Sequence, residues 1–206
     1  MKILHIDASP LGSASISRQL TAAVVSKLTR ENPAASVTHR DLIATPVSHL
    51  SGELLQVLRP APGSTPPTGE TVLAEAAQTE TLVTEFLAAD VLVIGAPMFN
   101  FSIPSQLKAW IDRVAQAGRT FQYTANGPVG LAKARTIVVS TRGGVYAGTA
   151  YEAAMDHQES YLRTVLTFLG ITDISFVRAE GIAMGPEKKE EALTTANRHI
   201  AELRAA

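Results

Sequence analysis

The pattern of apolar and polar residues contains five short runs that have the length of β-strands, and most of these runs are apolar. They lie at residues 2–8, 36–42, 90–96, 135–140 and 173–179. The third and fourth runs, with V-L-V-I at 91–94 and T-I-V-V at 136–139, are continuously apolar, as in strands buried on both faces of a parallel sheet. The second run is polar and alternating, which is typical of an edge strand. The pattern predicts a parallel sheet with a buried centre and a polar edge.

The segments between these runs show helical spacing. We expect helices at residues 17–30, 71–88, 104–115 and 151–169, and a last helix opened by Pro186. Trp110 belongs to an apolar stripe of the third helix and is therefore expected in the core. Alternation of strands and helices predicts a doubly wound α/β fold, with residues 1–206 forming one domain. The proline-rich residues 60–67 are expected as a surface excursion between the second and third strands, or as an interface arm.

Composition narrows the function mainly by exclusion. A formal net charge of -1 does not indicate a surface that binds nucleic acid, and no apolar run is long enough to span a bilayer. His5 and Asp7 interrupt the apolar start, which therefore does not resemble a signal peptide, and we expect a cytoplasmic protein. Because cysteine is absent, redox chemistry would need a bound cofactor.

The loop after the first strand is rich in serine. Ser9 follows the strand, and Ser15 and Ser17 lie where the next helix begins, a place that favours an anion. The loop has neither the Gly-Lys-Ser/Thr of triphosphate-binding loops nor G-x-G-x-x-G, so a phosphate monoester fits best. An ordinary turn with a serine N-cap is the alternative. Arg18 is expected to face solvent.

Two further loops follow the third and fourth strands. Residues 97–101 contain a methionine and two phenylalanines, which either pack in the core or line a pocket. Gly143 and Gly144 allow a ligand to approach the backbone closely, and a tight turn is the alternative. Because the carboxyl ends of parallel strands share one rim, all three loops should meet there. We interpret them as a flavin site, with the phosphate at the serines and the ring at the other two loops.

Together these segments resemble a known family. S-P…S-I-S, A-P-M-F-N-F-S-I-P-S-Q-L-K-A-W-I-D, T-F-Q-Y-T-A-N-G-P-V-G-L and S-T-R-G-G are similar to the FMN-dependent NADH azoreductase/quinone reductase family, over essentially the whole chain. The resemblance implies a flavodoxin-like fold with strand order 2-1-3-4-5 and helices on both faces. It also implies homodimers with active sites at the interface. The chain departs from the family in having Phe99 where many members have Tyr, and Ser102 where other polar residues occur.

The resemblance also implies the chemistry and the site. NADH, with NADPH as the alternative, would give a hydride to flavin N5, and a quinone or azo compound would then take two electrons in a ping-pong reaction. No catalytic side chain is needed, and azo compounds would be cleaved to amines. The implied contacts with the FMN phosphate and ring come from Ser9, Ser15, Ile16, Ser17, Met98, Phe99, Asn100, Phe101, Thr141, Arg142, Gly143 and Gly144.

Other side chains are candidates for substrate contact or for structural roles. We expect Phe121, Tyr123 and Tyr146 to contact aromatic substrates, with core packing as the alternative for one of the first two. Backbone N–H groups of Gly143 and Gly144 are expected to stabilise negative charge on the reduced ring. Asp7 is expected to bond a helix or loop, and no histidine shows metal-ligand spacing with carboxylates.

Two other flavin-binding functions compete with the enzyme. A flavodoxin-type electron carrier is usually strongly acidic so as to dock on basic partners, which a net charge of -1 disfavours. A flavin-binding regulatory protein is the second alternative. A hydrolase is disfavoured because the chain has no G-x-S-x-G motif.

Overall fold

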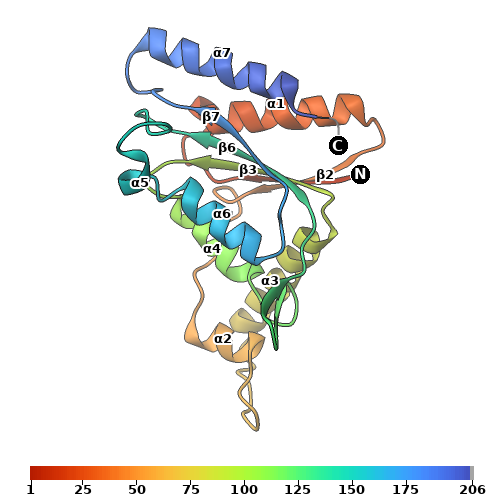
Figure 1. The fold of residues 1–206 in the computed structure, drawn as a ribbon. Coiled ribbons are helices and arrows are strands. Elements are labelled where there is room, and N and C mark those ends of the chain that lie inside the picture. Colours follow the sequence, from red (N-terminus) through yellow and green to blue (C-terminus); the bar gives the residue numbers. More distant parts are fainter. Residues whose placement is uncertain (205–206) are drawn as a thin grey trace.

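Five parallel strands form the central sheet of the computed structural model, which describes residues 1–204 (Figure 1). The strands run in the order β2-β1-β3-β6-β7, and their bounds are Lys2–Asp7 (β1), Ser36–Asp41 (β2), Val91–Pro97 (β3), Arg135–Thr141 (β6) and Ile174–Ala179 (β7). The predicted order is confirmed, because β6 and β7 are the fourth and fifth expected strands. The continuously apolar β3 is buried along its length, and the polar β2 is the exposed edge.

Helices cover both faces of the sheet (Figure 1). One layer holds α1 (Ile16–Glu31) and α7 (Pro186–Glu202), and the other holds α3 (Glu70–Ala88), α4 (Ser105–Val114) and α6 (Glu159–Phe168). Successive strand residues point to opposite faces, so Val93 packs in the first layer and Ile94 in the second. Each buried aliphatic side chain contributes about 1.5–3 kcal/mol. Trp110 lies in the core as expected, edge-on to Phe86.

The helix expected at residues 151–169 is two helices, so that prediction was wrong. α5 (Glu152–Met155) ends before Asp156, whose backbone leaves the helical region, and α6 begins at Glu159. The Asp156 carboxylate accepts hydrogen bonds from the backbone N–H groups of Gln158 and Glu159, at 3.1 and 2.9 Å. A short acidic side chain offers the backbone such an alternative to continuing the helix.

Several short elements join the main ones. They are η1 (Gly12–Ala14), α2 (Gly52–Leu58) and an antiparallel hairpin of β4 (Phe121–Thr124) and β5 (Gly127–Gly130). Residues 60–67 lie between α2 and α3, within the predicted crossover, and form the end of the molecule farthest from α7 in Figure 1. Within residues 1–204, none of the helices has the length and hydropathy needed to cross a bilayer.

Candidate active site

The loops that follow β1, β3 and β6 meet around one cavity of about 280 Å³, as expected from their place on the rim of the sheet. This volume is just below the range of roughly 300–1,000 Å³ for ligand pockets. The loop after β7 and the first turns of α7 complete the wall. The lining residues are Ser9, Leu11, Ala14, Ser15, Ile16, Pro97, Met98, Phe99, Thr141, Gly143, Ile182, Ala183 and Lys189.

The serine loop buries three hydroxyl groups at the start of α1. Ser9, Ser15 and Ser17 are each at most 2% exposed. The Ser15 Oγ accepts a hydrogen bond from the N–H of Arg18 at 3.3 Å and lies 3.0 Å from the Ser17 Oγ. Ser15 therefore caps α1 and also lines the cavity. The N-cap and the phosphate site, which were alternatives in the sequence, are compatible with each other. Ser17 lies behind it and does not line the cavity.

The charge of the cavity wall suits an anion. The first N–H groups of a helix have no partner within it and carry partial positive charge, and Ile16, the first residue of α1, lines the cavity. Of the lining residues, all within the described part of the chain, none is acidic and one, Lys189, is basic. A phosphate group therefore fits this end of the cavity.

Arg18 does not face solvent, which corrects the sequence-based expectation. Its guanidinium donates two hydrogen bonds of 2.7 Å to Asp41, and its Nε donates to the carbonyl oxygen of Ser9 at 3.0 Å. Hydrogen bonds from Arg18 hold the pKa of Asp41 well below its ordinary value, against the opposing effect of burial. The pair fixes the backbone of Ser9 to the end of β2, and so positions the serine loop.

Two histidines do lie against a carboxylate, which is a second correction. His5 and His39 are neighbours in the parallel register of β1 and β2, and their rings stack at 4.4 Å. Asp7 Oδ2 lies 3.3 Å from the Nε2 of His5 and 3.0 Å from that of His39. One nitrogen or oxygen atom of each of the three residues lies within 4.8 Å of the others, which is close enough to hold a metal ion.

Asp7 itself bonds to a helix, as expected. The hydroxyl of Thr21 on α1 donates to its Oδ1 at 2.9 Å. Burial acts to raise the pKa of Asp7, but the contacts with His5, Thr21 and His39 outweigh it, and the pKa lies below its ordinary value. The carboxylate therefore stays ionised and joins β1, β2 and α1 beside the serine loop.

The loop after β3 contains a tight turn in an unusual conformation. Phe99 and Ser102 exchange backbone hydrogen bonds of 2.9 and 3.0 Å, which leaves Asn100 and Phe101 as the two turn residues. Both have positive φ, 48° and 69°. Such a conformation costs a residue other than glycine about 1–3 kcal/mol and is concentrated at functional sites. Met98 and Phe99 line the cavity, whereas Asn100 and Phe101 do not.

The glycine loop after β6 is held by the segment that follows β7. Gly181 donates its N–H to the carbonyl oxygen of Gly144 at 2.8 Å, and Ala183 donates to that of Gly143 at 3.1 Å. Added Cβ atoms at the two glycines would come no closer than 3.4 Å to neighbouring side chains, which is ordinary contact. The fold itself therefore does not require glycine here, and close approach of a ligand is a reason for it. Thr141 and Gly143 line the cavity, and Gly144 does not.

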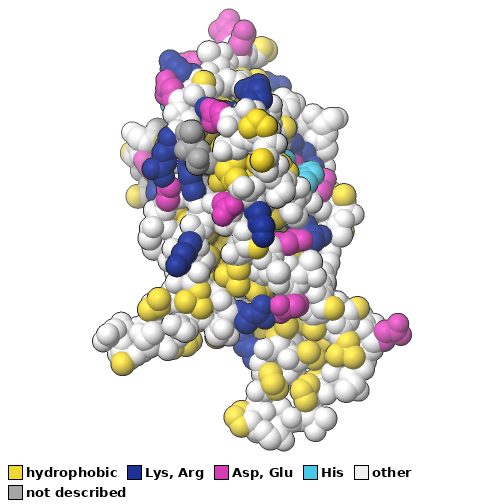
Figure 2. Space-filling model, turned by 90° about the vertical axis from the view of Figure 1, so that its right-hand side faces the viewer, with side chains coloured by type: hydrophobic (Ala, Val, Ile, Leu, Met, Phe, Trp, Pro, Cys, Tyr) yellow, Lys and Arg dark blue, Asp and Glu magenta, His cyan; other side chains and the backbone are white. Residues whose placement is uncertain are grey.

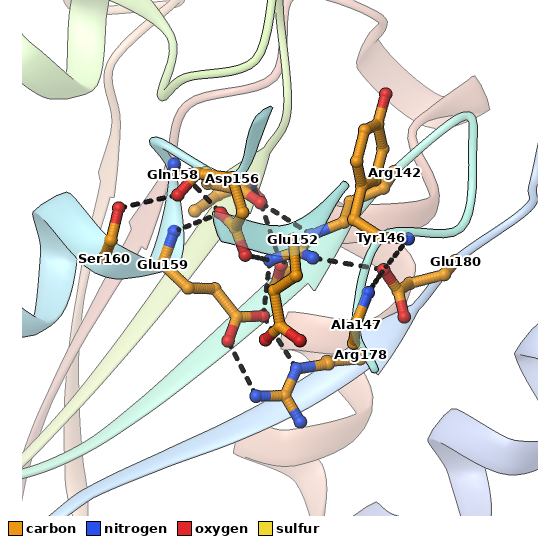
Figure 3. Close-up of polar contacts among 12 residues, drawn as sticks. Arg142, Tyr146, Ala147, Glu152, Asp156, Gln158, Glu159, Ser160, Arg178 and Glu180 are labelled. Atoms are coloured by element: carbon orange, nitrogen blue, oxygen red, sulfur yellow. Dashed lines mark hydrogen bonds and ion pairs between the residues drawn. The ribbon is translucent and has the colours of Figure 1, made fainter. Parts of the chain in front are cut away.

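The Arg142 side chain does not line the cavity, which corrects its expected contact with a cofactor. It points instead toward a group of carboxylates (Figure 3). It is completely buried, and it forms ion pairs with Asp156 at 2.7 Å, Glu159 at 2.7 Å and Glu180 at 3.0 Å. These carboxylates come from two other parts of the chain, the start of α6 with the turn before it and the residue after β7, so only the tertiary structure reveals why this arginine is buried.

The three expected substrate residues have different surroundings. Phe121 is 6% exposed and packs against Phe168 at 4.6 Å, so it is a core residue, which corrects its expected substrate contact. Tyr123, on the same strand, is 74% exposed. Tyr146 lies edge-on to Phe101 at 6.5 Å, between the two ring loops. Tyr123 and Tyr146 thus stay candidates.

Sequence reasoning missed part of the wall. Ile182 and Ala183 follow β7, whose carboxyl end shares the rim, and that position was the signal that could have found them. No local signal marks Lys189 in the first turns of α7. The missed lining residues are Leu11, Ala14, Pro97, Ile182, Ala183 and Lys189.

Comparisons with known proteins agree with this geometry. A family model described as the flavodoxin-like fold matches residues 1–203. The FMN-dependent NADH:quinone oxidoreductase of Azospirillum brasilense is 57% identical over 97% of this chain and 96% of its own. That of Ralstonia nicotianae is also 57% identical, over 96% of this chain and 94% of its own.

Solved structures are similar over the same extent. An azoreductase from Bacillus anthracis str. Sterne has a TM-score of 0.86 and 27% identity, and covers 98% of both chains. An FMN-dependent NADH-azoreductase from Bacillus anthracis str. Ames Ancestor, in complex with FMN, has a TM-score of 0.87 and 25% identity over 98% of this chain and 99% of its own. These findings confirm the resemblance noted in the sequence.

Proposed function

This chain belongs to the flavodoxin-like family that includes these oxidoreductases, and we propose that it is an FMN-dependent NADH:quinone oxidoreductase that also reduces aromatic azo compounds. The observation that carries the proposal is the meeting of three loops on one cavity. The cavity is lined by a buried serine loop at a helix N-terminus, by the two residues that precede the positive φ angles of the turn, and by the first of the two glycines.

The residues present fit FMN. Ser9, Ser15 and the N–H of Ile16 would hold the phosphate, with the Ser17 hydroxyl supporting that of Ser15. The ring would lie among Met98, Phe99, Thr141 and Gly143, with Asn100, Phe101 and Gly144 adjoining them. Residues 1–206 would form a single domain around this site.

When bound, FMN would supply two-electron chemistry between NADH, or alternatively NADPH, and a quinone or azo compound in a ping-pong sequence. The protein contributes binding and electrostatics. The N–H groups of Gly143 and Gly144 would stabilise negative charge near the ring, in a position fixed by the segment after β7. Met98 and Phe99 would keep water from one part of the cavity. No side chain is assigned as a nucleophile or a general acid.

The active unit is proposed to be a homodimer with the site at its interface. The cavity is small for a ligand pocket, and its surroundings include the exposed Phe99 and Phe101. Apolar side chains also lie on two projections at the lower end of the face in Figure 2, the end that holds α2 in Figure 1. Tyr123 would then reach the substrate of the second subunit. Sedimentation of the loaded protein would show a dimer, and a monomer at micromolar concentration would contradict this part.

The remaining parts of the proposal concern partners and location. The substrates are small aromatic compounds, and neither nucleic acid nor a membrane is proposed as a partner. We propose the cytoplasm as the location because NADH, the electron donor, is available there.

One experiment tests the function directly. The purified protein is loaded with FMN, its visible absorption is recorded under argon, and NADH and then benzoquinone are added. We expect the yellow colour to bleach with NADH and to return with quinone. Failure to bind FMN would refute the cofactor assignment. Reduction by a single electron would favour a flavodoxin-type carrier, and bound FMN without quinone turnover would favour a regulatory protein.

A further inference from the structure

A buried group of charged and polar side chains adjoins both loops assigned to the flavin ring (Figure 3). We call it the Arg142 cluster. Its members come from the residue after β6, the turn before α6, α6 itself, and the end of β7 with the residue after it. They are Arg142, Asp156, Gln158, Glu159, Arg178 and Glu180.

The cluster holds the glycine loop through Glu180. One carboxylate oxygen of Glu180 accepts hydrogen bonds from the backbone N–H groups of Tyr146 at 2.9 Å and Ala147 at 3.1 Å. The same oxygen accepts from Arg142 at 3.0 Å. Arg142 thus anchors the acceptor that fixes the far end of the glycine loop, while its own backbone begins that loop.

The cluster also holds the loop after β3. Arg142 Nε donates to the amide oxygen of Gln158 at 3.0 Å, and the amide nitrogen of Gln158 donates to the carbonyl oxygen of Ala96 at 2.5 Å. The next link comes from the same turn, where the N–H of His157 donates to the carbonyl oxygen of Phe101 at 3.1 Å. The end of β3 and the turn that follows it are therefore both joined to the segment that Arg142 fixes.

The charges of the cluster distinguish Arg142 from the second arginine, Arg178. Two guanidinium groups face three carboxylates, which leaves a formal charge of -1. Arg142 is completely buried and meets all three carboxylates, whereas the side chain of Arg178 is 37% exposed and bonds to Glu159 alone. Removing Arg142 would leave buried carboxylates without compensation and would release Glu180.

We propose that Arg142 is the positioning residue of the flavin site, and that it sets the glycine loop and the loop after β3 in the relative arrangement that receives the ring. The proposal rests on the proposed function, because it assigns these loops to FMN. Arg142 acts through Glu180 and Gln158 and makes no contact with the cavity.

Three variants separate positioning from charge. Arg142→Gln removes the central cation. Arg178→Gln makes the same charge change and also loses a contact with Glu159, but it leaves both ring loops bonded as before. Glu180→Ala changes the charge in the opposite direction and frees the N–H groups of Tyr146 and Ala147. If Arg142 acts by positioning, Arg142→Gln and Glu180→Ala should change FMN binding in the same way. If only charge matters, Arg142→Gln and Arg178→Gln should do so.

The readouts are the FMN dissociation constant, from quenching of flavin fluorescence, and backbone amide exchange of the full chain at residues 143–147 with and without FMN. We expect Arg142→Gln and Glu180→Ala to weaken FMN binding by about tenfold or more and to speed exchange, because each breaks a buried contact. Arg178→Gln should stay within about twofold of wild type, as a partly exposed ion pair contributes little.

Equal effects of Arg142→Gln and Arg178→Gln would overturn the proposal, as would unchanged binding and exchange in Arg142→Gln. If Arg142→Gln does not fold, the comparison of Glu180→Ala with Arg178→Gln decides in the same way. If the wild-type chain does not bind FMN, the proposed function fails, and amide exchange without FMN still tests whether Arg142 positions these loops.

Discussion

Replacing Ser15 with alanine separates the structural role of the serine loop from its proposed phosphate contact. The Ser15 hydroxyl caps α1 by accepting from the N–H of Arg18, and it also lies on the cavity wall. Loss of a serine N-cap costs about 1 kcal/mol of folding stability. A hydrogen bond to a charged group contributes about 1.5–3 kcal/mol, which corresponds to a fall in FMN affinity of roughly tenfold to a hundredfold.

Ser51 provides the control, because it caps α2 in the same way. Its hydroxyl accepts from the N–H of Leu54 at 3.0 Å, and it does not line the cavity. Ser51→Ala should therefore lose a similar amount of stability in a urea titration and keep the wild-type FMN dissociation constant, measured by fluorescence quenching. If Ser15→Ala and Ser51→Ala bind FMN equally well, the serine loop does not hold the phosphate and the reasoning fails.

Three further variants test the glycine loop, the Arg18–Asp41 pair and the buried Arg113. Gly144→Val should weaken FMN binding and slow reduction by NADH in stopped-flow measurements; unchanged values would remove the role given to this loop. The pKa of Asp41, lowered by Arg18, implies that its ionised form stabilises the fold above its ordinary value of 3.8 and that this is lost as the pH falls. Asp41→Asn should thus lose about 1–2 kcal/mol at pH 7 after solvent screening. In denaturation curves, the gap to wild type should narrow progressively as the pH falls below the ordinary value of 3.8; a constant gap would contradict this. Arg113 is completely buried and donates to the carbonyl oxygen of Ser48 at 3.2 Å, so Arg113→Met should cost about 3–5 kcal/mol in calorimetry and leave FMN affinity unchanged.

The sheet and the place of the site could be predicted from the sequence because both depend on local patterns. Continuous apolar runs identified the central strands, and the polar run at residues 36–42 identified the edge. The break at Asp156 was not predictable from helical spacing, since the carboxylate that ends one helix is also held by Arg142, which lies elsewhere in the chain.

The roles of individual side chains depended on partners that are distant in sequence. Arg18 faces Asp41, and His5 stacks on His39, only because β1 and β2 pair in one particular register. Phe121 and Tyr123 lie on the same side of one strand, with their ring centroids 5.6 Å apart. Phe121 is buried because it packs against Phe168 of α6, a partner that the local sequence does not show.

The bonds that fix the glycine loop have a consequence for the order of events during synthesis. Gly143 and Gly144 are bonded to residues 181 and 183, about 40 positions later in the chain, and Tyr146 to Glu180. A nascent chain can already contain the serine loop and the loop after β3. Its glycine loop, however, lacks these hydrogen bonds until Ala183 has left the ribosome. Pairing of distant segments is slow compared with local folding. FMN should therefore be captured only after the segment that follows β7 has been synthesised, and flavin binding would report that this segment has joined the glycine loop.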